Sequence, residues 1–161
     1  LFTSGDGGKT WHLARGAGAV GAAADSATVQ TLLWESASKT LYAAVSGADS
    51  AIYISRDNGA HWSSADDGLP PQTSAFALAE MASGGVATTG PTLYAATSAG
   101  VFALTSGGSK WQWAGGCRPR GTCDSLATDP LTPGLLYAGT AQTVYTSTDG
   151  GQRWAKVASA R

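Results

Sequence analysis

The feature that most constrains this chain is a motif that occurs four times along its 161 residues. In every copy an aromatic residue stands nine positions before a tryptophan, in the pairs Phe2/Trp11, Tyr53/Trp62, Phe102/Trp111 and Tyr145/Trp154. A repeat of this kind is read before any other signal, because each copy represents one structural unit of the fold.

Three copies share the pattern Ser-x-Asp-x-Gly-x-x-Trp. Their residues are Ser4, Asp6, Gly8 and Trp11; Ser55, Asp57, Gly59 and Trp62; and Ser147, Asp149, Gly151 and Trp154. The remaining copy, third of the four along the chain, is degenerate: it keeps Gly108 and Trp111, with Leu104 and Ser106 in place of the serine and the aspartate. In this pattern the glycine supplies the positive φ of a hairpin turn, and the aspartate and serine side chains accept main-chain N–H groups within it. The tryptophan is expected to pack over the turn and between neighbouring sheets. We therefore interpret these residues as structural.

A second motif precedes the last three copies. It reads Leu-Tyr-Ala-Ala at 41–44 and 93–96, and Leu-Tyr-Ala-Gly at 136–139, and each occurrence follows an apolar run at 29–34, 76–81 or 126–128. Each full repeat thus contains four short strand candidates, and the repeat tryptophans are 51, 49 and 43 residues apart. Four strands per unit with a period in the forties predict an all-β fold, a β-propeller made of four-stranded antiparallel blades.

The repeats divide the chain into blades within a single β-propeller region over 1–161. We expect a half blade at 1–14 and full blades at 27–66, 75–115 and 124–158, about three and a half blades in total. Propellers close with roughly four to eight blades, and an open arc would expose strand edges and apolar faces. We therefore expect either that the chain is part of a longer propeller, which we favour, or that copies associate to cover those edges.

These motifs resemble Asp-box (BNR) repeats over nearly the whole chain, most typically from Leu126 to Thr140 and on to the last box. The chain is similar to bacterial propellers of the sialidase-like and photosystem II assembly-factor-like kinds, and to sortilin-type and xyloglucanase propellers. The resemblance implies that the box is a structural turn on the face away from the ligand site. It is specific for the fold and does not indicate an activity.

The composition limits location and partners. The formal net charge is -1, so neither nucleic acid nor an anionic membrane is an implied partner, and no apolar stretch is long enough to span a bilayer. The two cysteines, Cys117 and Cys123, are spaced for a local disulfide and lack the further ligands of a metal site. A disulfide favours an extracytoplasmic location, whether secreted, periplasmic or at the cell surface. We expect no metal and no cofactor.

Several patterns suggest chemistry and have a plainer explanation. The segment Gly16–Gly21 matches G-x-G-x-x-G, but β-strands follow it where a dinucleotide fingerprint needs a helix, so we read a loop. His12 and His61 lie in different blades and are expected to be surface residues. A sialidase would need clustered arginines near the axis, whereas those present lie in loops, boxes or last strands: Arg15, Arg56, Arg118, Arg120, Arg153 and Arg161.

Carboxylates occur at the ends of the innermost strands. Glu35, Glu80 and Asp129 could in principle flank a glycosidic bond. Their alignment, however, places them at the turn between the first two strands of each blade, beside the Asp boxes. We interpret them as turn acids and predict no catalytic residue in this segment.

The segment between Cys117 and Cys123 is the candidate binding loop. It carries Arg118 and Arg120, and Trp113 stands just before it. A stapled loop with two arginines is preorganised to meet an acidic group or a peptide, and the alternative is a loop stapled only for stability, with solvated arginines.

These observations favour a non-catalytic binding or assembly propeller of a secreted or cell-surface bacterial protein, with a protein or glycan as its unidentified ligand. The alternative is part of a glycoside hydrolase, sialidase-like or xyloglucanase-like, whose catalytic residues lie largely outside this segment.

Overall fold

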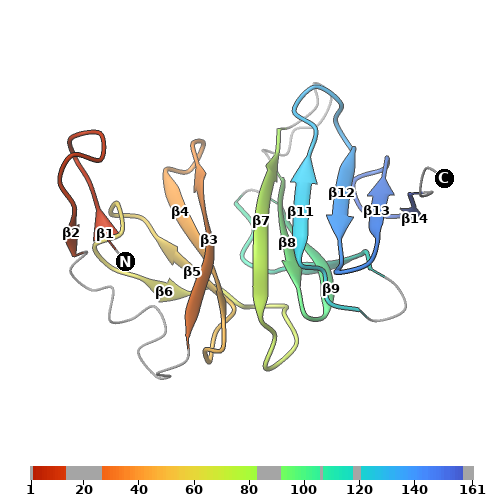
Figure 1. The fold of residues 1–161 in the computed structure, drawn as a ribbon, viewed down its shortest axis with the longest axis horizontal. Coiled ribbons are helices and arrows are strands. Elements are labelled where there is room, and N and C mark those ends of the chain that lie inside the picture. Colours follow the sequence, from red (N-terminus) through yellow and green to blue (C-terminus); the bar gives the residue numbers. More distant parts are fainter. Residues whose placement is uncertain (1, 14–26, 83–91, 106, 118–120, 158–161) are drawn as a thin grey trace.

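The computed structural model describes residues 2–13, 27–82, 92–105, 107–117 and 121–157. All regular elements within these residues are β-strands (Figure 1). They form one two-stranded sheet and three four-stranded sheets, in which neighbouring strands are antiparallel. The predicted all-β fold of four-stranded antiparallel sheets is therefore confirmed.

The strands follow the repeats in the sequence. The first sheet pairs β1 (Phe2–Thr3) with β2 (His12–Leu13). The second sheet contains β3 (Thr28–Glu35), β4 (Thr40–Ser46), β5 (Ile52–Ser55) and β6 (Ser63–Ser64). The third contains β7 (Ala75–Met81), β8 (Thr92–Thr97), β9 (Gly100–Thr105) and β10 (Gln112–Gly115). The fourth contains β11 (Ser125–Thr128), β12 (Leu136–Gly139), β13 (Val144–Ser147) and β14 (Ala155–Lys156).

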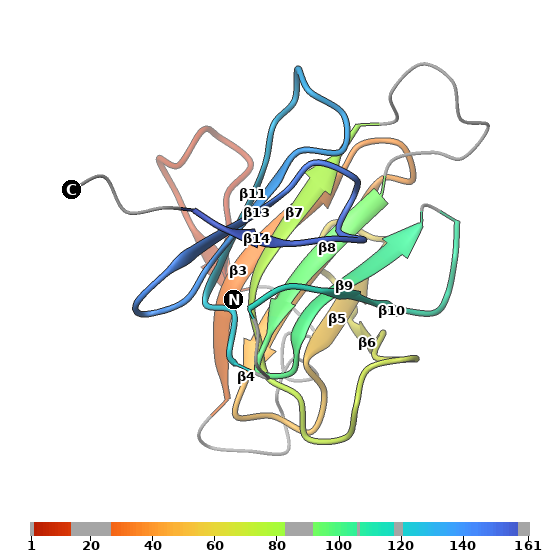
Figure 2. The ribbon, with the colours of Figure 1, turned by 90° about the vertical axis from the view of Figure 1, so that its right-hand side faces the viewer.

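The sheets stack face to face through their first strands. Strand β7 lies between β3 and β11 and contacts both (Figure 1). Viewed from the side, the fourth sheet lies in front of the third and second, and the two-stranded sheet lies at the far end (Figure 2). Within each four-stranded sheet the order is sequential, so the last strand of each is its outer edge.

Two apolar layers hold the stacked sheets together. The layer between the second and third sheets contains Leu78, Phe102 and Trp111, and the layer between the third and fourth contains Met81, Val101 and Leu136. The second strands, β4 and β8, are mostly buried: β8 brings Ala95 to the first layer and Ala96 to the second, while β4 brings Ala44 to the first layer. Because alanine side chains are small, neighbouring sheets can approach closely, and the Leu-Tyr-Ala motif thus supplies the inner packing surface.

Strand register decides which first-strand side chains enter which layer. Leu33 pairs with Tyr42 and packs into the layer between the second and third sheets. Leu32 and Trp34 lie on the opposite face of β3, where they are 45% and 44% exposed. One face of the second sheet is therefore covered by the third sheet, while the opposite face carries a buried cluster of Ala43, Val45, Tyr53 and Trp62 beside the exposed Leu32 and Trp34.

Candidate functional site

The three complete Ser-x-Asp-x-Gly-x-x-Trp segments form turns with the same hydrogen bonds. The serine Oγ accepts the N–H of the glycine, at 2.8 Å for Ser4 and Gly8, 2.8 Å for Ser55 and Gly59, and 2.9 Å for Ser147 and Gly151. The aspartate Oδ1 accepts the main-chain N–H four residues later, at 2.8 to 2.9 Å. The side chains thus tie each turn to itself, as a structural role requires.

The bonds that these aspartates accept stabilise their charged form. Hydrogen bonds from the Thr10 side chain and backbone lower the pKa of Asp6 to about 2, and those from the His61 backbone and side chain lower the pKa of Asp57 to about 2. The pKa of Asp149 is also lowered, chiefly by the N–H of Arg153. Each carboxylate is committed to its own turn, which leaves it unsuited to proton transfer at neutral pH.

The tryptophans of the third and fourth sheets connect neighbouring sheets. Trp111 donates its indole N–H to the carbonyl of Ala65, at 2.8 Å, and Trp154 donates to the carbonyl of Ala114, at 2.7 Å. Each acceptor follows the tryptophan of the preceding repeat by three positions. The indoles therefore fix the outer edge of one sheet against the next.

A pocket of about 520 Å³ lies beside the second of these connections. Gln112, Trp113, Ala114 and Gly115 of β10 line one side of it. The other side belongs to the fourth sheet: Tyr145 of β13 and the turn residues 150–154. The pocket is thus open between the outer edges of two sheets, with an apolar aromatic wall and polar side chains around it.

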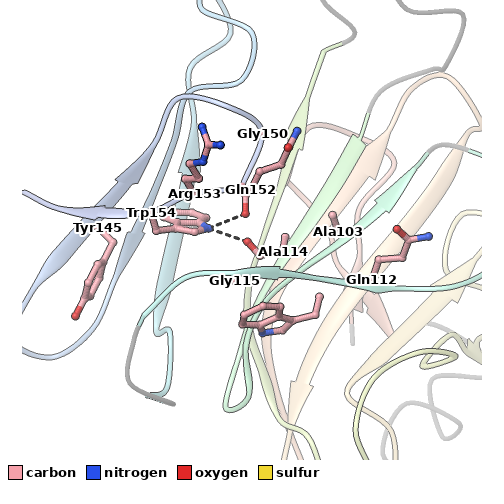
Figure 3. A pocket seen from close by; sticks show the side chains of 11 residues that line it. Ala103, Gln112, Ala114, Gly115, Tyr145, Gly150, Gln152, Arg153 and Trp154 are labelled. Atoms are coloured by element: carbon pink, nitrogen blue, oxygen red, sulfur yellow. Dashed lines mark hydrogen bonds between the residues drawn. The ribbon is translucent and has the colours of Figure 1, made fainter.

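The side chains in this pocket combine aromatic rings with amide and guanidinium groups. Figure 3 shows Trp154 held by its bonds to Ala114 and Gly151, with Arg153 and Gln152 above the indole. Gln112 lies on the other side of the pocket (Figure 3). Glutamine both donates and accepts hydrogen bonds and arginine donates, so the pocket can pair with a ligand that has many hydroxyl groups.

The stapled segment begins directly beyond the pocket. The predicted disulfide is confirmed: Cys117 and Cys123 are bonded, with their Cα atoms 5.8 Å apart, and both are buried. Arg118 and Arg120, the predicted binding residues of this loop, lie outside the described residues. Trp113, the third predicted binding residue, is 56% exposed at the pocket.

The acids of the first strands do not form an accessible pair. Glu35 is only 1% exposed; its Oε2 accepts a hydrogen bond from Ser38, and its Oε1 has no hydrogen-bond partner among the described residues. Glu80 points into the same gap between β3 and β7, and burial together with the charge of Glu35 raises its pKa. Burial and the Glu35 charge also raise the pKa of Tyr42 to about 12.

The other candidate polar residues, Asp129 and His61, each make their hydrogen bonds within their own turn. Asp129 caps its own turn by accepting the N–H groups of Leu131 and Thr132, at 2.8 and 3.2 Å. The His61 ring contacts Asp57 at 2.6 Å within one turn. Across the part of the chain that the structure describes, no group of three or more His, Cys, Asp or Glu side chains is placed to hold a metal ion.

Reasoning from the sequence missed most of this pocket. Gln112, Tyr145, Gln152 and Arg153 were given no binding role, because they come from two different repeats. A signal was nevertheless present in Trp113, since the equivalent positions of the other repeats carry Leu13, Ser64 and Lys156. The fold does not require an aromatic residue at this position.

No helix among the described residues is long and apolar enough to cross a membrane.

No family model matches the sequence. No curated protein matches it either. Solved structures do match its fold. The GH74 xyloglucanase from Xanthomonas campestris superposes with a TM-score of 0.71 and 20% identity, over 98% of this chain and 27% of that enzyme. An ancestral GH74 enzyme superposes with a TM-score of 0.65 and 21% identity, over 98% of this chain and 21% of that one.

The chain thus spans about a quarter of the length of these two enzymes. At this level of identity the likeness establishes a propeller-like fold along almost the whole chain.

Proposed function

We propose that this chain is a polysaccharide-binding segment of a β-propeller of the glycoside-hydrolase type, and that its own residues bind glycan without cleaving it. The observation that carries the proposal is the likeness to GH74 enzymes along 98% of the chain. Those enzymes include a xyloglucanase, so a β-linked glucan with sugar branches is the first substrate class to test.

The pocket between the third and fourth sheets supports a binding role. Polysaccharide sites place flat aromatic rings beside amide and charged groups, because a pyranose ring has apolar C–H faces and a rim of hydroxyls. Trp113, Trp154 and Gln112 provide this combination.

The placement of Glu35 and Glu80 argues against cleavage by this segment. Glycoside hydrolysis needs two carboxyl groups that flank the substrate, one as acid and the other as base or nucleophile. Glu35 is buried between two sheets, and Glu80 is half-buried and close enough to it for the Glu35 charge to raise its pKa. Within the described residues these acids act in packing, and we propose that cleavage, where it occurs, depends on other parts of the propeller.

The turns and the disulfide support two finer proposals. The hydrogen bonds shared by the three complete motif segments support the assignment of Asp-box (BNR) repeats. The disulfide between Cys117 and Cys123 supports an extracytoplasmic location.

Affinity electrophoresis tests the proposed function. The purified chain is run through native gels that contain xyloglucan, mixed-linkage β-glucan, polygalacturonate or no polysaccharide. Retardation by at least one polysaccharide relative to the empty gel is expected, and equal mobility in every gel overturns the proposal. Retardation by no glycan together with capture of a defined protein would favour the assembly role instead.

A further inference from the structure

The pocket between β10 and the turn at 150–154 exists because the chain leaves the third sheet differently from the second. After β6, residues 65–69 pass over Trp111, whose main-chain N–H donates to the Asp67 carbonyl at 2.7 Å. Trp111 is therefore only 2% exposed. A Cβ on Gly68 would lie 2.1 Å from the Trp111 carbonyl oxygen, which shows how closely this segment covers the tryptophan.

The chain takes another path after β10. Gly115 and Gly116 both adopt positive φ, at 88° and 75°, and lead directly to Cys117 and its disulfide. A Cβ on Gly115 would lie 3.0 Å from the Trp154 ring, and one on Gly116 would lie 2.6 Å from Val101. These glycines let the backbone pass close to Trp154 and turn inward. Beside Trp111 the space is filled by residues 65–69. The equivalent space beside Trp154 is an open pocket.

One wall of this pocket is held in place by hydrogen bonds within the protein. The Trp154 indole N–H is shared between the Ala114 carbonyl at 2.7 Å and the Gly151 carbonyl at 3.0 Å. The turn that carries Gln152 and Arg153 is tied by Ser147 and Asp149. The Trp154 indole and the backbone of this turn therefore lose little entropy on binding.

The residues at the mouth of the pocket differ from those at the equivalent positions of the other repeats. Trp113 is 56% exposed, whereas the corresponding residues are Ser64 in the second sheet and Lys156 in the fourth. Gln112 corresponds to Ser63 and Ala155. An exposed indole next to amide and guanidinium groups provides a flat apolar surface with hydrogen-bonding groups at its edge.

We propose that this pocket is a glycan-binding subsite on the outer edge of the propeller, away from its inner strands. It takes a short stretch of a pyranose chain, with a sugar ring against Trp113 and its hydroxyls bonded to Gln112 and Arg153. The Arg153 guanidinium can also pair with the carboxylate of an acidic sugar. The inference rests on the proposed function only in taking a glycan as the ligand.

The test is a titration of the full chain with cellohexaose, a xyloglucan oligosaccharide and an oligogalacturonide, followed by the NMR signals of the tryptophan indole N–H groups. The Trp113 and Trp154 signals are expected to shift saturably with at least one of these sugars. Trp113→Ser, which installs the residue found in the second sheet, is expected to weaken that sugar's binding by about tenfold or more.

Trp34→Ser is the matched control, because Trp34 is also a half-exposed tryptophan but lies on β3 outside the pocket. It is expected to bind with wild-type affinity. If Trp113→Ser folds poorly, Gln112→Ala provides the second variant, since it trims an exposed side chain. Equal affinity of wild type and both pocket variants overturns the proposal, as does the absence of any shift at Trp113 and Trp154 with all three sugars.

The two proposals fail in different ways. Retardation in a polysaccharide gel without a response at Trp113 and Trp154 overturns the pocket and leaves the proposed function standing. A saturable response of the pocket to a short sugar, with no retardation in any gel, overturns the polysaccharide binding of the proposed function and supports the pocket as a site for short sugars.

Discussion

The indole of Trp154 donates to the carbonyl of Ala114, 40 positions earlier in the chain, and so joins the fourth sheet to the outer strand of the third. Trp111 and Ala65 form the same connection one sheet earlier. The recurrence indicates that the repeat tryptophan does more than cover its own turn: it holds adjacent sheets in a fixed stacking.

Removing the indole donor tests this connection. Trp111→Phe should lower the free energy of unfolding by about 1–3 kcal/mol, because it leaves the Ala65 carbonyl without its partner at a buried site. Urea unfolding followed by circular dichroism measures the change. Trp34→Phe, at a half-exposed ring, serves as the control and should change stability by about 0.5 kcal/mol at most. Equal effects of the two variants would contradict the role assigned to Trp111.

Glu80 should make stability depend on pH in the weakly acidic range. Burial and the charge of Glu35 raise its pKa above 4.5 in the folded protein, so the fold binds this proton more tightly than the unfolded chain does. The resulting stabilisation is complete below about pH 4.5 and is lost as the pH rises through the raised pKa. Melting temperatures of Glu80→Gln should therefore fall less than those of the wild type between pH 4.5 and 7. Asp124→Asn, at an exposed carboxylate, should follow the wild type, and an unchanged slope in Glu80→Gln would refute this account.

The turn aspartates should act in the opposite direction at lower pH. The pKa of Asp57 falls from 3.8 to about 2 through its hydrogen bonds to His61 and Ser55, so its stabilisation is present above pH 3.8 and is lost as the pH falls towards 2. Asp57→Ala should be less stable than the wild type at pH 6, and the difference should narrow towards pH 2. Urea midpoints across this range provide the measurement. A difference that stays constant down to pH 2 would show that the carboxylate charge is not responsible.

The disulfide should stabilise the segment that follows the pocket residue Gly115. Replacing both Cys117 and Cys123 with serine should lower the free energy of unfolding by about 2 kcal/mol, the loop-closure value for a short loop. Calorimetry of the double variant, beside the wild type with and without reducing agent, measures this. If neither treatment moved the melting temperature, the disulfide would have no part in stability.

Most of the fold can be predicted from local patterns in the sequence. The Leu-Tyr-Ala motif and the Ser-x-Asp-x-Gly-x-x-Trp turn each describe a few consecutive residues, whose pairing is then set by short connections. Cys117 and Cys123 were likewise close enough in sequence for their bond to be predicted.

The pocket could not be predicted in this way, because it depends on where the chain goes after β10. Residues 65–69 cover one repeat tryptophan, and the turn at Gly115 and Gly116 leaves the next one beside open space. When the repeats are aligned with one another, the segments that follow β6 and β10 share no sequence pattern.

The relationship between Glu35 and Glu80 depends on strand register. Glu80 pairs with Leu93, as Trp34 pairs with Leu41, so Glu80 is equivalent to Trp34 rather than to Glu35. Side chains alternate along a strand, and this offset of one position turns the two acids toward each other across the gap.

The most direct test of the central claim, that this segment binds glycan without cleaving it, follows both properties in one experiment. The chain is incubated with xyloglucan, bound protein is measured by co-precipitation with the polysaccharide, and cleavage is measured as new reducing ends. We predict bound protein with no reducing ends above the buffer control. Release of reducing ends by the wild type, abolished in Glu80→Gln, would contradict the claim by assigning catalysis to the acids that we place in packing, and absence of both binding and cleavage would contradict the binding role.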